Sequence, residues 1–304
     1  MKRNSWIPII APFTIVLLSL SYVIPQEPHA KCKIMTYNIW NGFDWGKDTI
    51  RKENWMRWIQ DKNPDVLALQ ELCGYNEEKL KVEAAKWGHP YAKILKTEGY
   101  PTGLTSKKPI TIKERVTDGL WHGLLHCETY GIDFFVVHLS PADCDFRFNE
   151  ANSIKEKVKG IRSDKYIILG DFNAHSPFDE ELLKNNHTLL EKYSKNNSDQ
   201  YSNLRLGEFD YSVVSTFIAL PAIDVCNKFI DINDRYTYPS PVLVGSYRKT
   251  MNEVIQTRER IDYIFTSPIL SNSCTNVIIY NQGETETFSD HYPILAEFNF
   301  KTRK

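Results

Sequence analysis

Buried strands and helices alternate along this chain, and the alternation is the strongest constraint on its fold. Three runs of strand length are nearly free of polar residues until they end: 66–71 (VLALQE), 132–140 (IDFFVVHLS) and 166–173 (YIILGDFN). Such runs predict strands that are covered on both faces. Between them, Trp55, Trp58 and Ile59 recur at helical spacing within 47–61, and 148–161 predicts a second helix with its charged residues outside. We therefore expect an α/β protein with helices packed on a sheet.

The other segments extend this pattern. Residues 33–40 (KIMTYNIW) predict a strand that ends at Asn38, before an Asn-Gly turn. Ser176 and Pro177 are typical of a helix start, as N-cap and first helical residue. Residues 184–203 are polar and rich in asparagine, which indicates a surface excursion rather than a domain boundary. Further strands are predicted within 260–267, 276–281 and 291–300.

The first residues have the pattern of an export signal. Lys2 and Arg3 precede an apolar run at 6–24 without charged residues. We interpret 1–24 as a signal peptide or an N-terminal membrane anchor, and Pro8 and Pro12 weaken the anchor interpretation. Residues 31–304 then form one domain. The protein is expected to be exported, to the periplasm or the extracellular space, with a membrane-anchored form as the alternative.

Charge and cysteine content narrow the class of protein. Removing Lys2 and Arg3 from the 37 basic residues leaves 35 against 38 acidic ones, a formal charge of −3. A surface that grips a long polyanion has a strong basic excess, which this chain lacks. The six cysteines are widely spaced and predict either buried thiols or one or two disulfides. We expect a monomer.

Polar residues repeatedly follow the buried strands at the point where each strand ends. In α/β proteins such positions carry functional sites. Each residue alone has a structural explanation as a turn or cap, but together they are harder to explain in that way. The residues are Asn38, Glu71, His138, Asp171 and Asn173, joined by Asp262, Asp290 and His291.

This set of side chains suits the hydrolysis of a phosphate ester. Carboxylate and amide oxygens are hard ligands, which select Mg²⁺ or Mn²⁺ over zinc. Attack of water on a phosphodiester near neutral pH needs a proton acceptor and a charge sink, which a histidine oriented by a carboxylate and a metal ion can supply. The sequence has no His/Cys cluster that would indicate structural zinc.

Six motifs occur in the order found in one superfamily: TYNIW (36–40), LQE (69–71), VVHLSP (136–141), GDFNAH (170–175), RIDYIF (260–265) and SDHYP (289–293). In this combination the chain resembles the endonuclease/exonuclease/phosphatase superfamily. The resemblance implies an α/β fold, a four-layer α/β sandwich with two mixed β-sheets flanked by helices. It places the site at one end of the sandwich, and it implies that Asn38, Glu71 and Asp290 hold the metal, with Glu71 as principal ligand.

The same resemblance implies the catalytic roles. Asp171 and Asn173 position the attacking water and the phosphate oxygens. His291 acts as a base or as a partner of the transition state, held by Asp262. His138 matches a substrate-contacting histidine of deoxyribonuclease-like and sphingomyelinase-like members.

The surroundings of the site are less determined. The histidine of deoxyribonuclease-like members is normally paired with a glutamate, for which Glu98 is the one candidate. Basic groups that could ring the site are Lys107, Lys108, Arg248 and Lys249, with ordinary solvated charge as the alternative.

Two loops are candidates for contact with the substrate. Phe43 and Trp45 could contact a base or a lipid, or fill the end of the sandwich. Residues 237–241 (TYPSP) resemble a segment that closes one side of the site in exported relatives.

We expect a metal-dependent phosphoesterase that hydrolyses a phosphodiester, in the manner of a nuclease, by attack of an activated water. The substrate would be a nucleic acid, a phospholipid head group or a small phosphodiester, with membrane contact only through an uncleaved N-terminal segment. A phospholipid or inositol-phosphate hydrolase is the alternative. From other classes, a catalytically inactive binding domain on the same scaffold and a carboxylate-pair glycosidase remain, and the glycosidase would not need a metal.

Overall fold

The computed structural model describes residues 29–196, 198, 202–248 and 250–301. The predicted signal segment 1–24 lies outside them. Within the described ranges, no helix is long and apolar enough to span a membrane.

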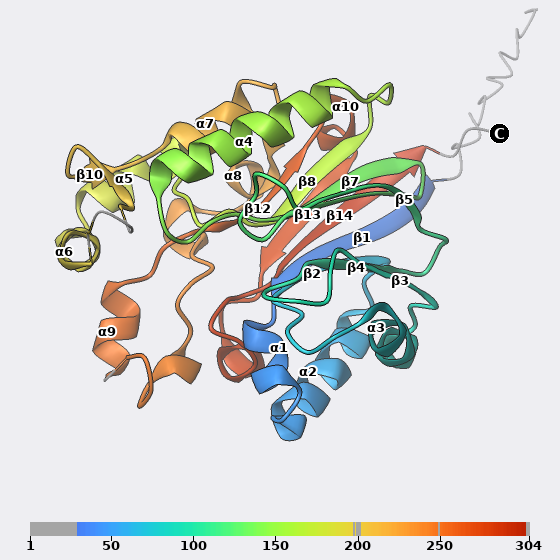
Figure 1. Cartoon of the computed structure of the whole chain (residues 1–304), viewed down its shortest axis with the longest axis horizontal. Helices are drawn as coiled ribbons and strands as arrows, with labels where there is room; N and C mark the ends of the chain where they lie inside the picture. Colours follow the sequence, from blue (N-terminus) through green and yellow to red (C-terminus); the bar gives the residue numbers. More distant parts are fainter. Residues whose placement is uncertain (1–28, 197, 199–201, 249, 302–304) are drawn as a thin grey trace, which may run out of the picture.

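Two six-stranded sheets pack face to face in the centre of the molecule (Figure 1). Each is mixed, because β1 and β2 run parallel in the first sheet and β7 and β8 run parallel in the second, while the other neighbours are antiparallel. The first sheet has the order β13-β14-β1-β2-β4-β3, with β1 (His29–Asn38), β2 (Val66–Gln70), β3 (Tyr91–Ile94), β4 (Gly103–Ser106), β13 (Cys274–Ile279) and β14 (Ile294–Lys301). The second has the order β11-β12-β8-β7-β6-β5, with β5 (Thr111–Val116), β6 (Leu124–Thr129), β7 (Ile132–His138), β8 (Tyr166–Asp171), β11 (Ile223–Asp224) and β12 (Asp262–Thr266).

Helices cover the outer face of each sheet (Figure 1). Two of them, α2 (Thr49–Lys62) and α3 (Glu77–Ala84), pack on the first sheet, while α4 (Cys144–Lys159) and α7 (Ser212–Ile218) pack on the second. The predicted contact face of α2 is confirmed, since Trp55, Trp58 and Ile59 are buried against this sheet. The four layers confirm the predicted sandwich. The remaining helical segments include α1 (Trp40–Trp45), α5 (Glu180–Lys184), α6 (His187–Lys195), α8 (Val225–Phe229), α9 (Met251–Gln256) and α10 (Pro268–Ser271).

The apolar runs become strands that are buried on both faces, as predicted. In β2, Val66 and Ala68 face the second sheet, whereas Leu67 and Leu69 face the covering helices. The alternation follows from the two-residue period of a strand. A central strand of a four-layer sandwich therefore has no solvent face on which polar residues would be needed.

The segment 184–203 contains a helix that the sequence does not predict. In α6, Leu189 is fully buried and the Tyr193 hydroxyl donates to Glu259 Oε2 at 2.7 Å. Ser176 is an N-cap as predicted, since its Oγ accepts from Phe178 N at 3.2 Å. It caps a short 3₁₀ turn (Pro177–Asp179) that leads into α5.

The structure decides between buried thiols and disulfides, the two predicted states of the cysteines. All six lie within the described residues, and all are buried and free. The interpretation as buried thiols is confirmed, and the cysteines contribute to the apolar cores.

Candidate active site

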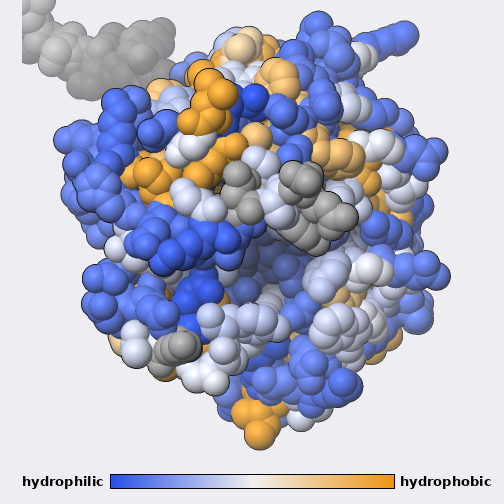
Figure 2. Space-filling model, turned by 60° about the vertical axis from the view of Figure 1, so that its left-hand side comes forward, coloured by the Kyte–Doolittle hydropathy of each residue, from blue (hydrophilic) through white to orange (hydrophobic). Residues whose placement is uncertain are grey.

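The ends of five strands and the loop before β14 place the predicted site residues together at one end of the sandwich. His138 and Asp262 are both in register with Asp171, on the two strands that flank β8. Gly170 makes this possible, because a Cβ there would lie 2.0 Å from the Val137 carbonyl oxygen and β7 could not approach. Asn38 ends β1 on the facing sheet. Figure 2 brings this side of the molecule forward and shows a hollow in its surface.

Asp171 is the centre of the site. Its Oδ2 accepts a hydrogen bond from Asn38 Nδ2 at 3.0 Å and lies 3.4 Å from His138 Nε2 and 3.7 Å from His291 Nε2. All four residues are buried. Burial raises the pKa of Asp171 to about 8, although the nearby His291 opposes the rise. This carboxylate therefore has unusual affinity for a proton.

His291 lies between two carboxylates. Its Nδ1 is 2.9 Å from Asp262 Oδ2, and its Nε2 faces Asp171. Burial alone would lower the pKa of His291, but the charges of Asp262 and Asp171 outweigh it and raise that pKa well above its usual value. The structure thus brings together the pair that the motifs predicted.

The segment 237–241 holds this pair in place. The Thr237 hydroxyl accepts from Asp262 N at 3.1 Å, and the Tyr238 ring lies 4.9 Å from the His291 ring. Ser240 N donates to the Asp290 carbonyl oxygen at 2.9 Å. The segment thus packs against Asp262, His291 and Asp290, on the side of the site that the resemblance implies it closes.

Glu71, Asp290 and Asn38 form the acidic side of the site. Asn38 Nδ2 also donates to Glu71 Oε1 at 3.2 Å, and Ser289 Oγ donates to the Asn38 carbonyl oxygen at 2.7 Å and lies 3.3 Å from Asp290 Oδ1. Burial and the charge of Asp290 raise the pKa of Glu71 to about 6, and burial raises that of Asp290. The two carboxylates therefore form a half-buried negative charge that their neighbours compensate only in part.

The carboxylate and amide oxygens on this side of the site suit a hard divalent cation as ligands. Carboxylates that repel one another in a buried site are stabilised by a cation between them. In the described part of the chain, Asp171, Asp262 and His291 also have ligand atoms within 4.8 Å of one another. Two neighbouring groups of residues thus suit a metal ion: the acidic side of the site, and the group that contains Asp171.

Glu71 and Asn173 have left-handed backbone conformations, with φ of 61° and 47°. Non-glycine residues rarely adopt them, and such strain concentrates at functional sites. Asn41 N donates to Glu71 Oε2 at 2.7 Å, while Asn173 N donates to Asp171 Oδ1 at 2.9 Å and its Nδ2 to the Leu139 carbonyl oxygen at 3.0 Å. Local hydrogen bonds therefore fix both residues.

The turn drawn as α1 in Figure 1 is left-handed throughout. Its non-glycine residues Trp40, Asn41, Phe43, Asp44 and Trp45 all have positive φ. Each left-handed residue costs about 1–2 kcal/mol, so tertiary contacts must hold this turn. Phe43 is fully buried and fills the end of the sandwich, whereas Trp45 is exposed. Of the predicted alternatives for these two aromatics, the structure selects a core role for Phe43.

Arg51 is the main contact that holds the turn, and sequence reasoning missed it. Its guanidinium donates from Nη2 to the Trp40 carbonyl oxygen at 3.2 Å and from Nη1 to that of Phe288 at 2.8 Å. It also lies 4.8 Å from the Trp40 ring and 5.1 Å from the Phe43 ring. Arg51 therefore joins the segment that follows Asn38 to the segment that precedes Asp290.

The environment of His138 differs from the predicted one. Its ring stacks on His122, with centroids 4.0 Å apart, while Glu98 is exposed. Burial lowers the pKa of His138 well below its usual value, and that of His122 to about 3. Among the described residues, His138 Nδ1 is buried without a hydrogen-bond partner. The stacked ring of His122, which no sequence signal marked, therefore orients His138 together with its contact to Asp171.

Of the two interpretations of Lys107 and Lys108, the structure favours ordinary charge away from the site, since both follow β4 at the end of the sheet opposite Glu71. Lys107 pairs with Asp65 at 3.0 Å, before the first residue of β2, whereas Glu71 follows the last. Arg248 does lie near the site, with its Cζ 6.0 Å from the Tyr238 ring. Lys249 lies outside the described residues.

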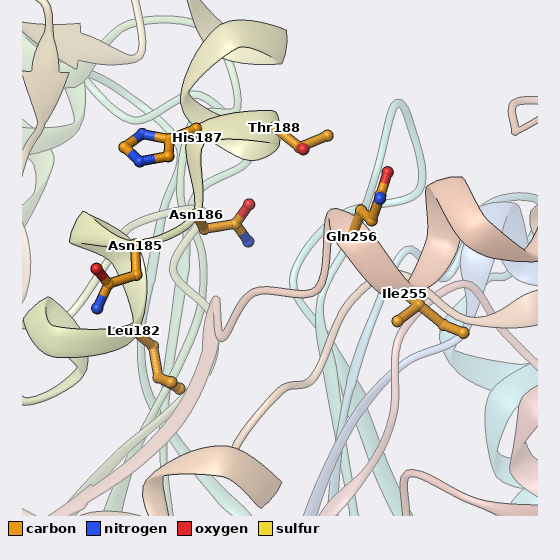
Figure 3. Close-up of a pocket in the computed structure, with 7 residues that line it drawn as sticks. All are labelled: Leu182, Asn185, Asn186, His187, Thr188, Ile255 and Gln256. Carbon is orange, nitrogen blue, oxygen red and sulfur yellow. The ribbon is translucent and has the colours of Figure 1, made fainter.

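A separate pocket of about 360 Å³ lies between the α5–α6 segment and α9 (Figure 3). Its lining includes none of the predicted site residues. The residues are Leu182, Asn185, Asn186, His187, Thr188, Ile255 and Gln256. With a single histidine and no carboxylate or lysine, this pocket lacks the groups that the chemistry requires.

Comparison with known proteins agrees with this geometry. The model of the Endonuclease/Exonuclease/phosphatase family matches residues 35–291. No match was found among curated proteins.

Solved structures share the fold. An AP endonuclease from Archaeoglobus fulgidus is 18% identical, with 88% of this chain and 99% of that chain covered and a TM-score of 0.63. The 3′-5′ exonuclease NExo from Neisseria meningitidis is 18% identical, with 88% and 100% covered and a TM-score of 0.62. The 3′ phosphatase NExo from Neisseria, bound to a product DNA hairpin, has the same identity and coverage and a TM-score of 0.61.

Proposed function

We propose that this chain, which belongs to the endonuclease/exonuclease/phosphatase family, hydrolyses a phosphodiester by attack of an activated water. The motifs predicted this family, and the chain is a metal-dependent phosphoric ester hydrolase. The observation that carries the proposal is the position of Asp171. A buried carboxylate faces Asn38, His138 and His291 within 3.0–3.7 Å, so the groups that the reaction needs surround one oxygen atom.

In the proposed mechanism Asp171 Oδ2 takes a proton from the attacking water. A proton acceptor must lie within hydrogen-bond reach of that water and have a pKa near the working pH, and the raised pKa of Asp171 meets the second condition. Asn38 Nδ2 and Asn173 N orient the carboxylate through its two oxygens. Asn173 and His138 contact the phosphate oxygens.

His291 acts as a charged partner of the phosphate rather than as the base. Both of its ring nitrogens face carboxylates, Asp262 at 2.9 Å and Asp171 at 3.7 Å, which favours the imidazolium form. An imidazolium donates hydrogen bonds and stabilises the negative charge that develops on phosphate. Asp262 orients the ring and balances its charge.

Glu71, Asp290 and Asn38 would hold the metal ion, for which we propose Mg²⁺ or Mn²⁺. The bound cation supplies a charge sink for the phosphate oxygens. Asn41 N and Ser289 Oγ keep the oxygens of Glu71 and Asp290 in place.

The proposed function is tested with bis(4-nitrophenyl) phosphate in the presence of Mg²⁺. Release of nitrophenol is expected, and Asp171→Ala should lower kcat/KM by about 10²- to 10⁴-fold, the range for loss of a positioned proton acceptor. The matched control is Asp133→Asn, since Asp133 is a buried carboxylate on β7 that pairs with His126 away from the site. If the wild-type protein hydrolyses only the phosphate monoester 4-nitrophenyl phosphate, the proposal is wrong.

Arg51→Met is expected to weaken metal binding by about 10- to 100-fold, the typical cost of losing a group that supports metal ligands. Without the guanidinium, the left-handed turn and the Phe288 carbonyl oxygen lose their common partner, and the acidic side of the site can relax. Binding is measured without turnover, as the rise in melting temperature over a Mg²⁺ titration.

The control for this substitution is Lys52→Met on the same helix. Lys52 pairs with Glu83 at 2.8 Å and is largely buried, but it contacts neither segment of the site. Equal metal affinity in the wild type and Arg51→Met would rule out the positioning role of Arg51.

A further inference from the structure

Aromatic side chains form a continuous strip that leads outward from His138. His122 stacks on His138, and its ring lies 5.4 Å from that of Tyr100 and 6.4 Å from that of Trp121. Trp121 in turn lies 5.9 Å from Phe146. The exposed fractions of Trp121, Phe146 and Tyr100 are 47%, 38% and 37%, so these rings remain available to a ligand.

The strip continues toward the acidic side of the site. Tyr247 is 69% exposed, and its ring packs edge-on against Trp40, which follows Asn38 by two residues. Leu72 N donates to the Pro101 carbonyl oxygen at 2.9 Å and Cys73 Sγ to that of Gly99 at 3.4 Å, which places Tyr100 beside the segment that follows Glu71. Tyr100, Trp121, His122, Phe146 and Tyr247 together are called the aromatic rim below.

The backbone beneath the aromatic rim is fixed. The buried carboxylate of Glu150 accepts from Trp121 N at 2.7 Å and from Ser140 N at 2.8 Å, which ties the Trp121 loop to the loop that follows β7. An exposed indole on an anchored backbone loses little conformational freedom when it binds a flat partner. The aromatic rim is thus organised before any ligand arrives.

Two cations lie around the Tyr238 ring, beside His291. Lys192 Nζ and Arg248 Cζ lie 5.7 and 6.0 Å from the Tyr238 ring, which itself contacts His291. Arg248 donates to the carbonyl oxygen of Tyr247 at 3.1 Å and to the Tyr238 hydroxyl at 3.4 Å, while its Nε is buried with no partner among the described residues. Lys192 is already paired, with its Nζ 3.6 Å from Glu259 Oε1, so Arg248 is the cation that can attract an anion neighbouring the reacting phosphate.

From this arrangement we infer that the substrate is a short or single-stranded nucleic acid, whose bases stack on the aromatic rim while Arg248 attracts a neighbouring phosphate. Aromatic platforms combined with cations are the usual means of binding single strands. The inference rests on the proposed phosphodiesterase function and names the substrate class of that same site.

Other substrates fit the aromatic rim less well. The bases of a duplex are stacked on one another and cannot reach Trp121 or Tyr100, and a protein with a formal charge of −1 offers few phosphate contacts along a duplex. A protein that binds a lipid surface usually presents a contiguous apolar patch. The hollow in Figure 2 is bordered mostly by hydrophilic residues.

The test compares two dimers with one phosphodiester each, in Mg²⁺. One is thymidylyl-thymidine, and the other replaces both nucleosides with tetrahydrofuran spacers, which have no bases. The wild type is expected to favour the thymidine dimer in kcat/KM by about 5- to 100-fold, the range for one stacked base. Trp121→Ala should bring this ratio close to one, and Trp121→Phe should restore most of it.

The control variant is Tyr91→Ala, which removes an exposed aromatic residue on β3. Tyr91 pairs with Ser106, and Ser106 with Val66 at the start of β2, so it lies at the end of the sheet away from Glu71. The ratio should stay at the wild-type value. A terminal phosphate on the thymidine dimer should raise kcat/KM, and Arg248→Met should abolish that gain.

The outcomes separate the inference from the proposed function. If neither dimer nor bis(4-nitrophenyl) phosphate is hydrolysed, the proposed function itself fails. Equal kcat/KM for both dimers, or an unchanged ratio in Trp121→Ala, overturns the inference and leaves the phosphodiesterase intact. Faster turnover of a duplex than of the same single strand, or of sphingomyelin vesicles than of either dimer, assigns the site to another substrate class.

Discussion

His291→Ala is expected to lower kcat/KM by about 10³- to 10⁴-fold, and Asp262→Asn should produce most of the same loss. The 2.9 Å contact between His291 Nδ1 and Asp262 Oδ2 makes the two side chains one unit. An asparagine cannot balance an imidazolium, and its amide can present a donor to Nδ1, which selects the wrong tautomer. The variant thus keeps the shape of the site and loses its charge.

The double variant is the decisive measurement. If Asp262 acts only through His291, the double variant should be little slower than His291→Ala alone, because the second substitution removes nothing further. Losses that add in the logarithm of kcat/KM would mean that the two residues act separately.

The chain contains a matched control for this comparison of single and double variants. His126 Nε2 lies 2.7 Å from Asp133 Oδ1 in another buried histidine–carboxylate pair, on β6 and β7. His126→Ala and Asp133→Asn should lower the melting temperature and leave kcat/KM near the wild-type value. A comparable loss of activity in these variants would indicate that the first result reflects stability.

The architecture was predictable because burial leaves a local signature. A strand covered on both faces must be apolar throughout, so Val66–Gln70 and Ile132–His138 are readable in the sequence. The helix α6 leaves no such signature. Only Leu189 is buried within it, and its attachment depends on the contact between Tyr193 and Glu259, 66 residues apart.

The site was predictable where its residues end strands. Asn38, Glu71 and Asp171 follow from that rule, because strand ends meet at the same edge of a sandwich. Arg51 does not follow, since its partners are backbone carbonyl oxygens, one of them 237 residues away, and a carbonyl acceptor has no sequence signal.

The placement of Lys107 away from the site has a topological cause. This residue follows β4, which runs antiparallel to β2, so it lies at the opposite end of the sheet from Glu71. The order of strands within a sheet decides such placements, and a single sequence does not reveal it.

Removal of divalent metal is expected to abolish hydrolysis, and Mg²⁺ or Mn²⁺ should restore it. The physical reason is the half-buried charge of Glu71 and Asp290, which repels an anionic ester unless a cation compensates it. The measurement is turnover of bis(4-nitrophenyl) phosphate in excess chelator, followed by titration with each metal. Full turnover in excess chelator would contradict both the mechanism and the metal assignment.

The substitution Glu71→Gln tests whether Glu71 holds the metal ion on which activity depends. The amide keeps the size of the side chain and an oxygen that can accept from Asn41 N, but it removes one of the two negative charges. The Mg²⁺ concentration for half-maximal activity should rise by more than the roughly 10- to 100-fold that a supporting residue costs. The control is Glu83→Gln, whose carboxylate is bonded to Lys52 and the Tyr75 hydroxyl on the outer side of the first sheet. If Glu71→Gln retains the wild-type Mg²⁺ dependence, the cation is held elsewhere, and the group formed by Asp171, Asp262 and His291 becomes the metal site to test.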